Sequence, residues 1–115
     1  MHPELIACIS AHAAVDKACD LLGIRLIKIP LVTNTYQIDL KLMVNMIGPN
    51  TILLYASAPS FPHGVIDPIE YMSDIAVRYD IGKQTYTLYI LFTCIFIYVY
   101  TVYSTSYILF VLFCV

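Results

Sequence analysis

The chain has 115 residues, of which 60% are hydrophobic, and its formal net charge is −2. Every Asp, Glu, Lys and Arg lies within residues 1–83, so the segment 84–115 carries no charged side chain. A slightly acidic chain without a basic run lacks the electrostatic surface of a nucleic-acid-binding protein, and that class is excluded. The charge boundary predicts two parts, a polar part over residues 1–83 and an apolar tail over residues 84–115.

The first predicted elements are a helix and a short strand. Apolar residues recur at helical spacing over residues 13–22, with charged residues on the opposite side. Gly23 follows directly and is a common helix end, because glycine adopts the left-handed conformation without a Cβ clash. Residues 24–29 then alternate imperfectly between apolar and basic and stop at Pro30, which is typical of a strand.

Another helix, strand and helix are predicted in the second half of the polar part. Asp39 is suited to cap a helix over residues 40–47. The uninterrupted apolar run 51–56 has the length of a strand that is buried on both faces. After a loop rich in proline, Pro68 is suited to the first position of a helix over residues 68–79.

This alternation of helices and strands is typical of the α/β class, in which helices cover a parallel sheet. A crossover through the helix 40–47 requires the strands 24–29 and 51–56 to be parallel. With only two strands predicted, the polar part is expected to be a slice of a larger α/β domain rather than a complete one.

The tail is long enough to cross a membrane once, since about 20 apolar residues are sufficient. We therefore predict a candidate transmembrane helix within residues 84–115, continuous over residues 86–112. Arg78 and Lys83 precede the tail and no basic residue follows it, which favours a cytosolic N-terminal part. Two alternatives remain open: β-branched and aromatic residues also suit aggregation-prone strands, and the tail could be translated non-coding sequence joined by a gene-model error.

The cysteines show neither a C-x-x-C pair nor a spacing to histidine that is typical of zinc sites. No metal site is predicted. Reduced, buried thiols are the expected state of Cys8, Cys19, Cys94 and Cys114.

Two runs of sequence carry a family resemblance. Residues 10–18 read S-A-H-A-A-V-D-K-A, and residues 50–69 read N-T-I-L-L-Y-A-S-A-P-S-F-P-H-G-V-I-D-P-I. They are similar to the runs S-A-H-A-A-F-x-K-A and N-T-x-x-L-x-x-S-x-P-x-F-P-H-G-x-I-D-P-I of the sphingosine-1-phosphate lyases, which are fold-type-I pyridoxal-phosphate enzymes of the group II decarboxylase superfamily. The resemblance covers residues 5 to about 82, and it implies an internal fragment of the large domain of such an enzyme.

The resemblance implies cofactor contacts for three residues. In the family, the histidine at the position of His12 stacks on the pyridine ring of pyridoxal 5'-phosphate, and the loop that holds Ser57 and His63 runs beside the cofactor. Each residue also has a purely structural interpretation. A histidine at a helix start can be a cap or a surface residue, and Ser57 and His63 can serve the turn chemistry of a proline-rich loop. Asp67, before Pro68, is interpreted as a helix cap.

The sequence departs from the family pattern at the positions that carry out the family's chemistry. Family members continue after Tyr79 into a strand P-L-H-V-D-A, whose Asp pairs with the pyridine nitrogen, whereas here the apolar tail begins. A Schiff-base lysine in an N-K pair and a Gly-Thr loop for the phosphate have no counterpart, and none of Lys17, Lys28, Lys41 and Lys83 lies in a matching context. No catalytic residue is therefore predicted.

The resemblance implies that the family cleaves sphingoid-base 1-phosphates to a long-chain aldehyde and phosphoethanolamine, and that its members are homodimers. This chain is expected to be inactive alone. The alternatives are a membrane-anchored, non-catalytic interaction protein and a gene-model artefact with a non-native tail. Together, the family and the tail predict a membrane location, in the endoplasmic reticulum with the N-terminal part cytosolic.

Overall fold

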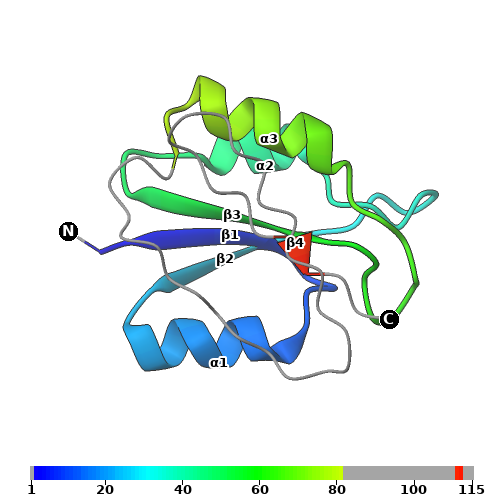
Figure 1. The fold of residues 1–115 in the computed structure, drawn as a ribbon, viewed down its shortest axis with the longest axis horizontal. Helices are drawn as coiled ribbons and strands as arrows, with labels where there is room; N and C mark the ends of the chain where they lie inside the picture. Colours follow the sequence, from blue (N-terminus) through cyan, green and yellow to red (C-terminus); the bar gives the residue numbers. More distant parts are fainter. Residues whose placement is uncertain (1, 82–110, 113–115) are drawn as a thin grey trace.

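A parallel sheet forms the middle of the fold in a computed structural model, which describes residues 2–81 and 111–112 (Figure 1). In this part of the chain the sheet has four strands in the order β2-β1-β3-β4, and every neighbouring pair is parallel. The elements are β1 Glu4–Cys8, α1 Ala13–Leu22, β2 Arg25–Ile29, α2 Leu40–Met46, β3 Thr51–Ser57, α3 Ile69–Arg78 and β4 Val111–Leu112.

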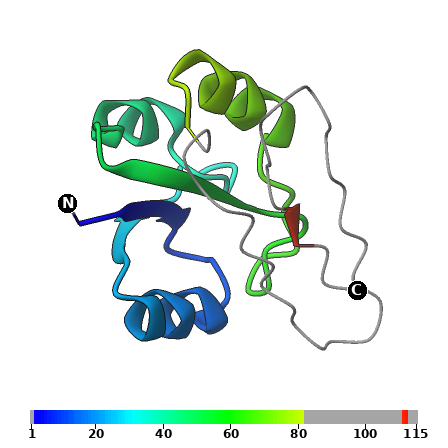
Figure 2. The same cartoon turned by 60° about the vertical axis from the view of Figure 1, so that its left-hand side comes forward.

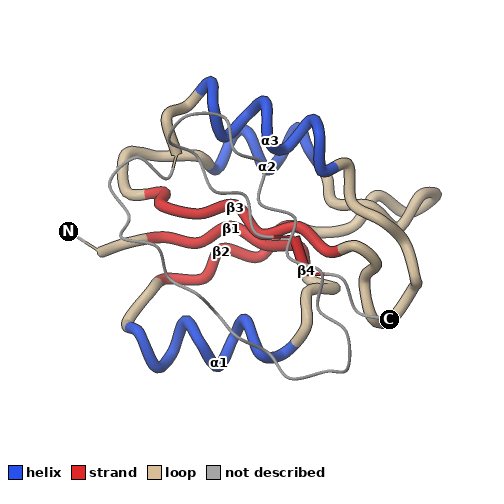
Figure 3. The backbone as a smooth tube through the Cα atoms, viewed as in Figure 1, coloured by secondary structure: helices blue, strands red, loops and turns tan. Residues whose placement is uncertain are grey.

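Helices cover both faces of the sheet: α1 lies on one face, and α2 and α3 lie on the other (Figures 1 and 3). The side chains of β1 show why two layers form, because successive residues of a strand point to opposite faces. Leu5 and Ala7 belong to the core that includes Val15 of α1. Ile6 and Cys8 belong to the larger core under the other two helices. The alternation of one short strand therefore supplies both cores.

The α/β class and the five predicted elements of the polar part are confirmed, with ends that differ by at most one residue. Gly23 ends α1 in the left-handed conformation, with φ 67°, as predicted. The two predicted strands are both parallel to β1 and hence to each other.

The prediction of only two strands in the polar part is wrong, because β1 lies between β2 and β3. β1 pairs with β2 from Glu4↔Arg25 to Cys8↔Ile29. Its sequence, E-L-I-A-C, is five residues long and too short to show a clear period. The strand that joins the sheet together is thus the one with the weakest sequence signal.

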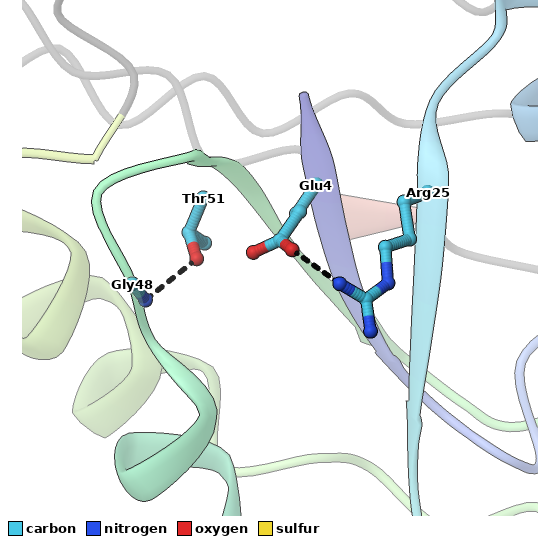
Figure 4. A network of polar contacts seen from close by, with 4 residues as sticks. All are labelled: Glu4, Arg25, Gly48 and Thr51. Carbon is cyan, nitrogen blue, oxygen red and sulfur yellow. Dashed lines mark hydrogen bonds and ion pairs between the residues drawn. The ribbon is translucent and has the colours of Figure 1, made fainter. Parts of the chain in front are cut away.

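Polar contacts lie at the amino ends of the strands (Figure 4). Arg25 Nη1 at the start of β2 donates to Glu4 Oε1 of β1 at 3.0 Å. At the start of β3, Thr51 Oγ1 accepts a hydrogen bond from Gly48 N, also at 3.0 Å. These contacts lie at the edge of the sheet opposite the carboxyl ends of the strands, so the polar residues there have structural partners.

The predicted helix over residues 86–112 lies outside the described residues except at its end. There it is wrong, because Val111 and Leu112 form a strand that pairs with Ala56 and Ser57. Extended pairing is open to these residues since β-branched and large apolar side chains suit strands. Within the described residues, no helix has both the length and the apolar character needed to cross a membrane.

Cys8 and Cys19 are buried, free thiols, as predicted. Burial raises the pKa of the Cys19 thiol, and the nearby charges of Asp16 and Asp20 add to the shift. The thiol is therefore protonated at neutral pH and behaves as a small apolar core residue. Cys94 and Cys114 lie outside the described residues.

Candidate functional site at the carboxyl edge of the sheet

His12 lies at the carboxyl edge of the sheet, where the chain leaves β1 and enters α1. It is the N-cap of α1, and its Nδ1 accepts a hydrogen bond from Ala14 N at 3.2 Å. Because Nδ1 is the acceptor, the proton of the neutral ring is on Nε2. The cap fixes the imidazole at the helix start, and the residue remains exposed.

The ring of His12 has one described aromatic neighbour, Phe61. The two ring centroids are 6.2 Å apart and the rings are nearly perpendicular, at 88°. Edge-on contact of this kind is a favourable arrangement of aromatic quadrupoles. Phe61 comes from the loop after β3 and is 77% exposed, which is unusual for such a large apolar side chain. The loop therefore reaches across the edge of the sheet to the N-cap of α1.

The other two predicted contact residues lie at the start of this loop and within it. Ser57 is the last residue of β3 and is buried. His63 is exposed and stacks on Tyr36, with ring centroids 4.7 Å apart and an angle of 19° between the planes. Tyr36 adopts φ 55°, a left-handed conformation that is uncommon for residues other than glycine. No local sequence pattern indicates this pair, because its members are distant in the chain.

Asp67 does not cap α3, so its interpretation as a helix cap is wrong. The N-cap of α3 is Pro68, and no side chain caps that helix. The Asp67 carboxylate instead turns inward, where Oδ2 accepts from Ser57 N at 2.8 Å and Oδ1 accepts from Ile38 N at 3.4 Å. The side chain thereby joins the end of β3 to the connection between β2 and α2, and it is 3% exposed.

Further polar contacts close the loop on itself. Gly64 N donates to Ser60 O and Ser60 N donates to Val65 O, both at 2.8 Å. Gln37 Nε2 donates to Ile66 O at 3.0 Å, which adds a second contact to the β2–α2 connection. Ser60 Oγ is buried and has no hydrogen-bond partner among the described residues. A buried hydroxyl of this kind usually has a partner, so the loop is incompletely satisfied.

The described lysines are found on α1, on β2 and in the first turn of α2. Lys28 forms an ion pair with Asp16 on the α1 side of the sheet. Lys17 and Lys41 lie on exposed positions of α1 and α2. Among the described residues, no group of three or more His, Cys, Asp and Glu is arranged to hold a metal ion. The carboxyl edge thus offers imidazole and aromatic rings.

Solved structures define the class of protein to which this fold belongs. The tyrosine aminotransferase of Leishmania infantum matches with a TM-score of 0.63 at 19% identity, covering 69% of this chain and 22% of that one. The Thermus thermophilus aspartate aminotransferase matches with a TM-score of 0.65, also at 19% identity, covering 70% of this chain and 22% of that chain. The described part has the α/β fold of the aminotransferases.

More similar relatives identify the family. The sphingosine-1-phosphate lyase of Dictyostelium discoideum is 44% identical over 80 residues, and that of Saccharomyces cerevisiae is 48% identical over 77. These matches cover 70% and 67% of this chain, respectively. The structure of the sphingosine-1-phosphate lyase of Burkholderia pseudomallei matches with a TM-score of 0.68 and 38% identity, over 70% of this chain and 18% of that one. The chain belongs to the sphingosine-1-phosphate lyase family.

The chain spans only 15% of the length of the Dictyostelium lyase and 13% of the yeast lyase. No family model matches it. The similarity therefore identifies a segment, and the activity of whole lyases does not follow for this chain from the similarity alone.

Proposed function

We propose that residues 2–81 are the segment of a pyridoxal-phosphate-dependent carbon–carbon lyase that faces the ring of the cofactor. The whole enzyme would cleave a phosphorylated sphingoid base to a long-chain aldehyde and phosphoethanolamine. The position of His12 is the observation that supports this proposal most strongly. Its ring is fixed as the N-cap of α1 and remains exposed at the carboxyl edge of a parallel sheet, where open α/β sheets bind their ligands.

The described residues fit only part of a cofactor site. His12 would supply a flat face for the pyridine ring, and Ser57 and His63 would lie beside it. When bound, the cofactor supplies an electron sink for the carbon–carbon cleavage. The described lysines are on α1 and α2 or paired with Asp16, and the carboxylate of Asp67 is occupied by two backbone N–H groups. The chain alone is therefore proposed to be inactive.

A chimera tests the proposal directly. Residues 2–81 would replace the matching segment of the Dictyostelium lyase, which is 44% identical over the aligned region. We expect the chimera to cleave a phosphorylated sphingoid base and to lose most of that activity with His12→Ala in the graft. His2→Ala is a matched control, because His2 is an exposed histidine at the amino end of the sheet. A folded chimera without activity, or one that tolerates His12→Ala, would refute the proposal.

A second candidate function is non-catalytic association with another lyase subunit, as the homodimers of the family suggest. Two exposed apolar side chains favour it: Leu21 is 81% exposed on α1, and Phe61 is 77% exposed at the carboxyl edge. Large exposed apolar side chains are common at surfaces that partners cover. Co-purification with a tagged full-length lyase, abolished by Leu21→Lys or Phe61→Lys, would support it.

A membrane location remains a prediction from the composition of residues 84–115. On that prediction the tail anchors the chain in the endoplasmic reticulum, with the N-terminal part cytosolic. Membrane fractionation with and without alkaline extraction tests it.

A further inference from the structure

A small hairpin lies between β2 and α2. It comprises residues 31–38, whose two end residues form an antiparallel bridge. Val32 N donates to Gln37 O at 2.9 Å, and Tyr36 N donates to Val32 O at 2.8 Å, which closes the turn. This edge hairpin and the loop of residues 58–67 each follow the carboxyl end of a strand, so both lie at the carboxyl edge of the sheet (Figures 1 and 2).

The edge hairpin contacts the 58–67 loop through three consecutive residues, Tyr36, Gln37 and Ile38. The last two are joined by hydrogen bonds to Ile66 O and to the carboxylate of Asp67, at the end of the loop. Tyr36 instead stacks on His63, in the middle of the loop, with ring centroids 4.7 Å apart. The hydrogen bonds therefore hold the end of the loop in place, and the stack holds the imidazole.

Tyr36 adopts a backbone conformation that a tyrosine does not favour. Its φ is 55°, in the left-handed region where glycine and asparagine are preferred over other residues. The residue is 48% exposed, so burial in the core does not explain a tyrosine at this position. Strained residues persist where the surrounding structure holds them, and they cluster at functional sites. The stack on His63 is the observed contact that accounts for the tyrosine.

We propose that Tyr36 is a positioning residue whose ring holds the imidazole of His63 in place at the carboxyl edge. The inference rests on the proposed function, in which His63 lies beside the cofactor. An exposed imidazole changes rotamer readily, and a ring stacked on it at an angle of 19° limits this motion. Backbone strain at residue 36 is thus accepted in exchange for a preorganised ring at the site.

Two substitutions separate positioning from a purely structural role. Tyr36→Asn suits the left-handed backbone but cannot stack, whereas Tyr36→Phe keeps both the ring and the strain. If the stack served stability alone, Tyr36→Asn would lower the stability of the fold. A positioning residue shows the opposite pattern, because relief of strain maintains stability while the function is lost. We therefore expect the urea midpoint of the full-length Tyr36→Asn chain to be equal to or higher than that of the wild type.

Proton NMR of the histidine Cε1–H groups measures the stack itself in the full-length chain, in a mild detergent. The signal of His63 is assigned with a His63→Gln variant. The ring current of Tyr36 should shift this signal upfield. Tyr36→Asn should remove the shift, and Tyr36→Phe should retain it.

Kinetics of the chimera that carries residues 2–81 in the Dictyostelium lyase test the functional role. We expect Tyr36→Asn to lower kcat/KM by about tenfold or more, because small misplacements of groups at a reaction site are costly. Tyr36→Phe should restore the value of the unsubstituted chimera. Tyr71→Asn is the matched control, since Tyr71 is a 52% exposed tyrosine on α3, and it should leave kcat/KM unchanged.

The outcomes distinguish this inference from the proposed function. An active chimera that keeps its kcat/KM with Tyr36→Asn would overturn the inference and leave the proposed function standing. Equal losses with Tyr36→Asn and Tyr36→Phe would overturn it too, because the ring would then not be what matters. A urea midpoint that falls together with kcat/KM in Tyr36→Asn would show a purely structural role. An inactive unsubstituted chimera would refute the proposed function, and this inference with it.

Discussion

Asp67 offers a sharp test of how the carboxyl edge is held in place. Its carboxylate is 3% exposed and accepts hydrogen bonds from Ser57 N at 2.8 Å and from Ile38 N at 3.4 Å. Asp67→Asn keeps the shape of the side chain but replaces one acceptor oxygen by an NH₂ group, which cannot accept from a backbone N–H. Asp67→Ala removes both acceptors.

The expected loss of unfolding free energy follows mainly from the shorter of the two hydrogen bonds, the one from Ser57 N. A hydrogen bond to a charged group contributes about 1.5–3 kcal/mol, and a buried donor left without a partner costs about 1–3 kcal/mol. Burial raises the pKa of Asp67, while the hydrogen bonds from Ser57 and Ile38 lower it. The net rise means that desolvation of the charge outweighs these bonds, so neutralising the group recovers part of the loss. We therefore expect a decrease in unfolding free energy of about 1–2 kcal/mol for Asp67→Asn and about 3 kcal/mol for Asp67→Ala.

Urea unfolding of the full-length chain in a mild detergent, followed by circular dichroism at pH 7, measures both values. Asp20→Asn is the control, because it removes an exposed carboxylate from α1. Hydrogen exchange adds a local measurement. The amides of Ser57 and Ile38 should exchange faster in both Asp67 variants, and their exchange rates should be unchanged in the control. An Asp67→Ala variant no less stable than Asp20→Asn would refute the role assigned to this carboxylate.

The remaining predictions concern pH, a helix end and the histidine cap. Folding raises the pKa of Asp67, so its contribution to stability is greatest below the unfolded pKa of about 3.9 and is lost as the pH rises through the folded value. The difference in unfolding free energy between wild type and Asp67→Asn should therefore fall with rising pH in that window. A difference that rises instead would contradict the assignment. Gly23→Ala should lower the unfolding free energy by about 1 kcal/mol, because an alanine would be strained at the φ of 67° found there. A Cβ at this position would meet no atom within 4 Å, so backbone strain is the only cost. An unchanged free energy in urea unfolding would contradict this prediction. His12→Ala should lower it by about 0.5–1 kcal/mol through loss of the cap on α1, whereas His12→Asn should restore most of that loss.

The sequence predicted the local elements of this fold better than their assembly. Helices and strands between residues 13 and 79 followed from periodicity, from Gly23 and from Asp39, because each depends on neighbouring residues. β1 was missed, since its five residues carry no period long enough to read. Its place at the centre of the sheet is decided by pairing with two distant strands, which no local pattern shows.

The candidate site was predictable to a similar extent. The position of His12 at a helix start could be read from the sequence, and the resemblance supplied its interpretation. The inward turn of Asp67 could not be read, because an aspartate before a proline has the same local pattern whether it caps a helix or bonds to a distant backbone. The stacking of Tyr36 on His63 likewise depends on a left-handed residue that is not a glycine.

The composition of the apolar tail does not distinguish a membrane helix from a buried strand. Its aromatic and β-branched residues satisfy the requirements of a membrane helix and of a buried strand equally well. Of residues 84–115 the structure describes only Val111 and Leu112, and these two residues form a strand that pairs with β3.

Titration of the full-length chain with pyridoxal phosphate tests the central claim most directly, namely that this segment presents a ring-stacking face and lacks the lysine chemistry of a lyase. A surface aromatic contact contributes about 1 kcal/mol, far below the roughly 8 kcal/mol that micromolar binding requires. We predict no saturable change in visible absorbance up to millimolar cofactor and, after borohydride reduction, no lysine adduct above that of an unrelated protein. A saturable micromolar change, with an adduct abolished by substituting one of Lys17, Lys28, Lys41 or Lys83, would contradict the account.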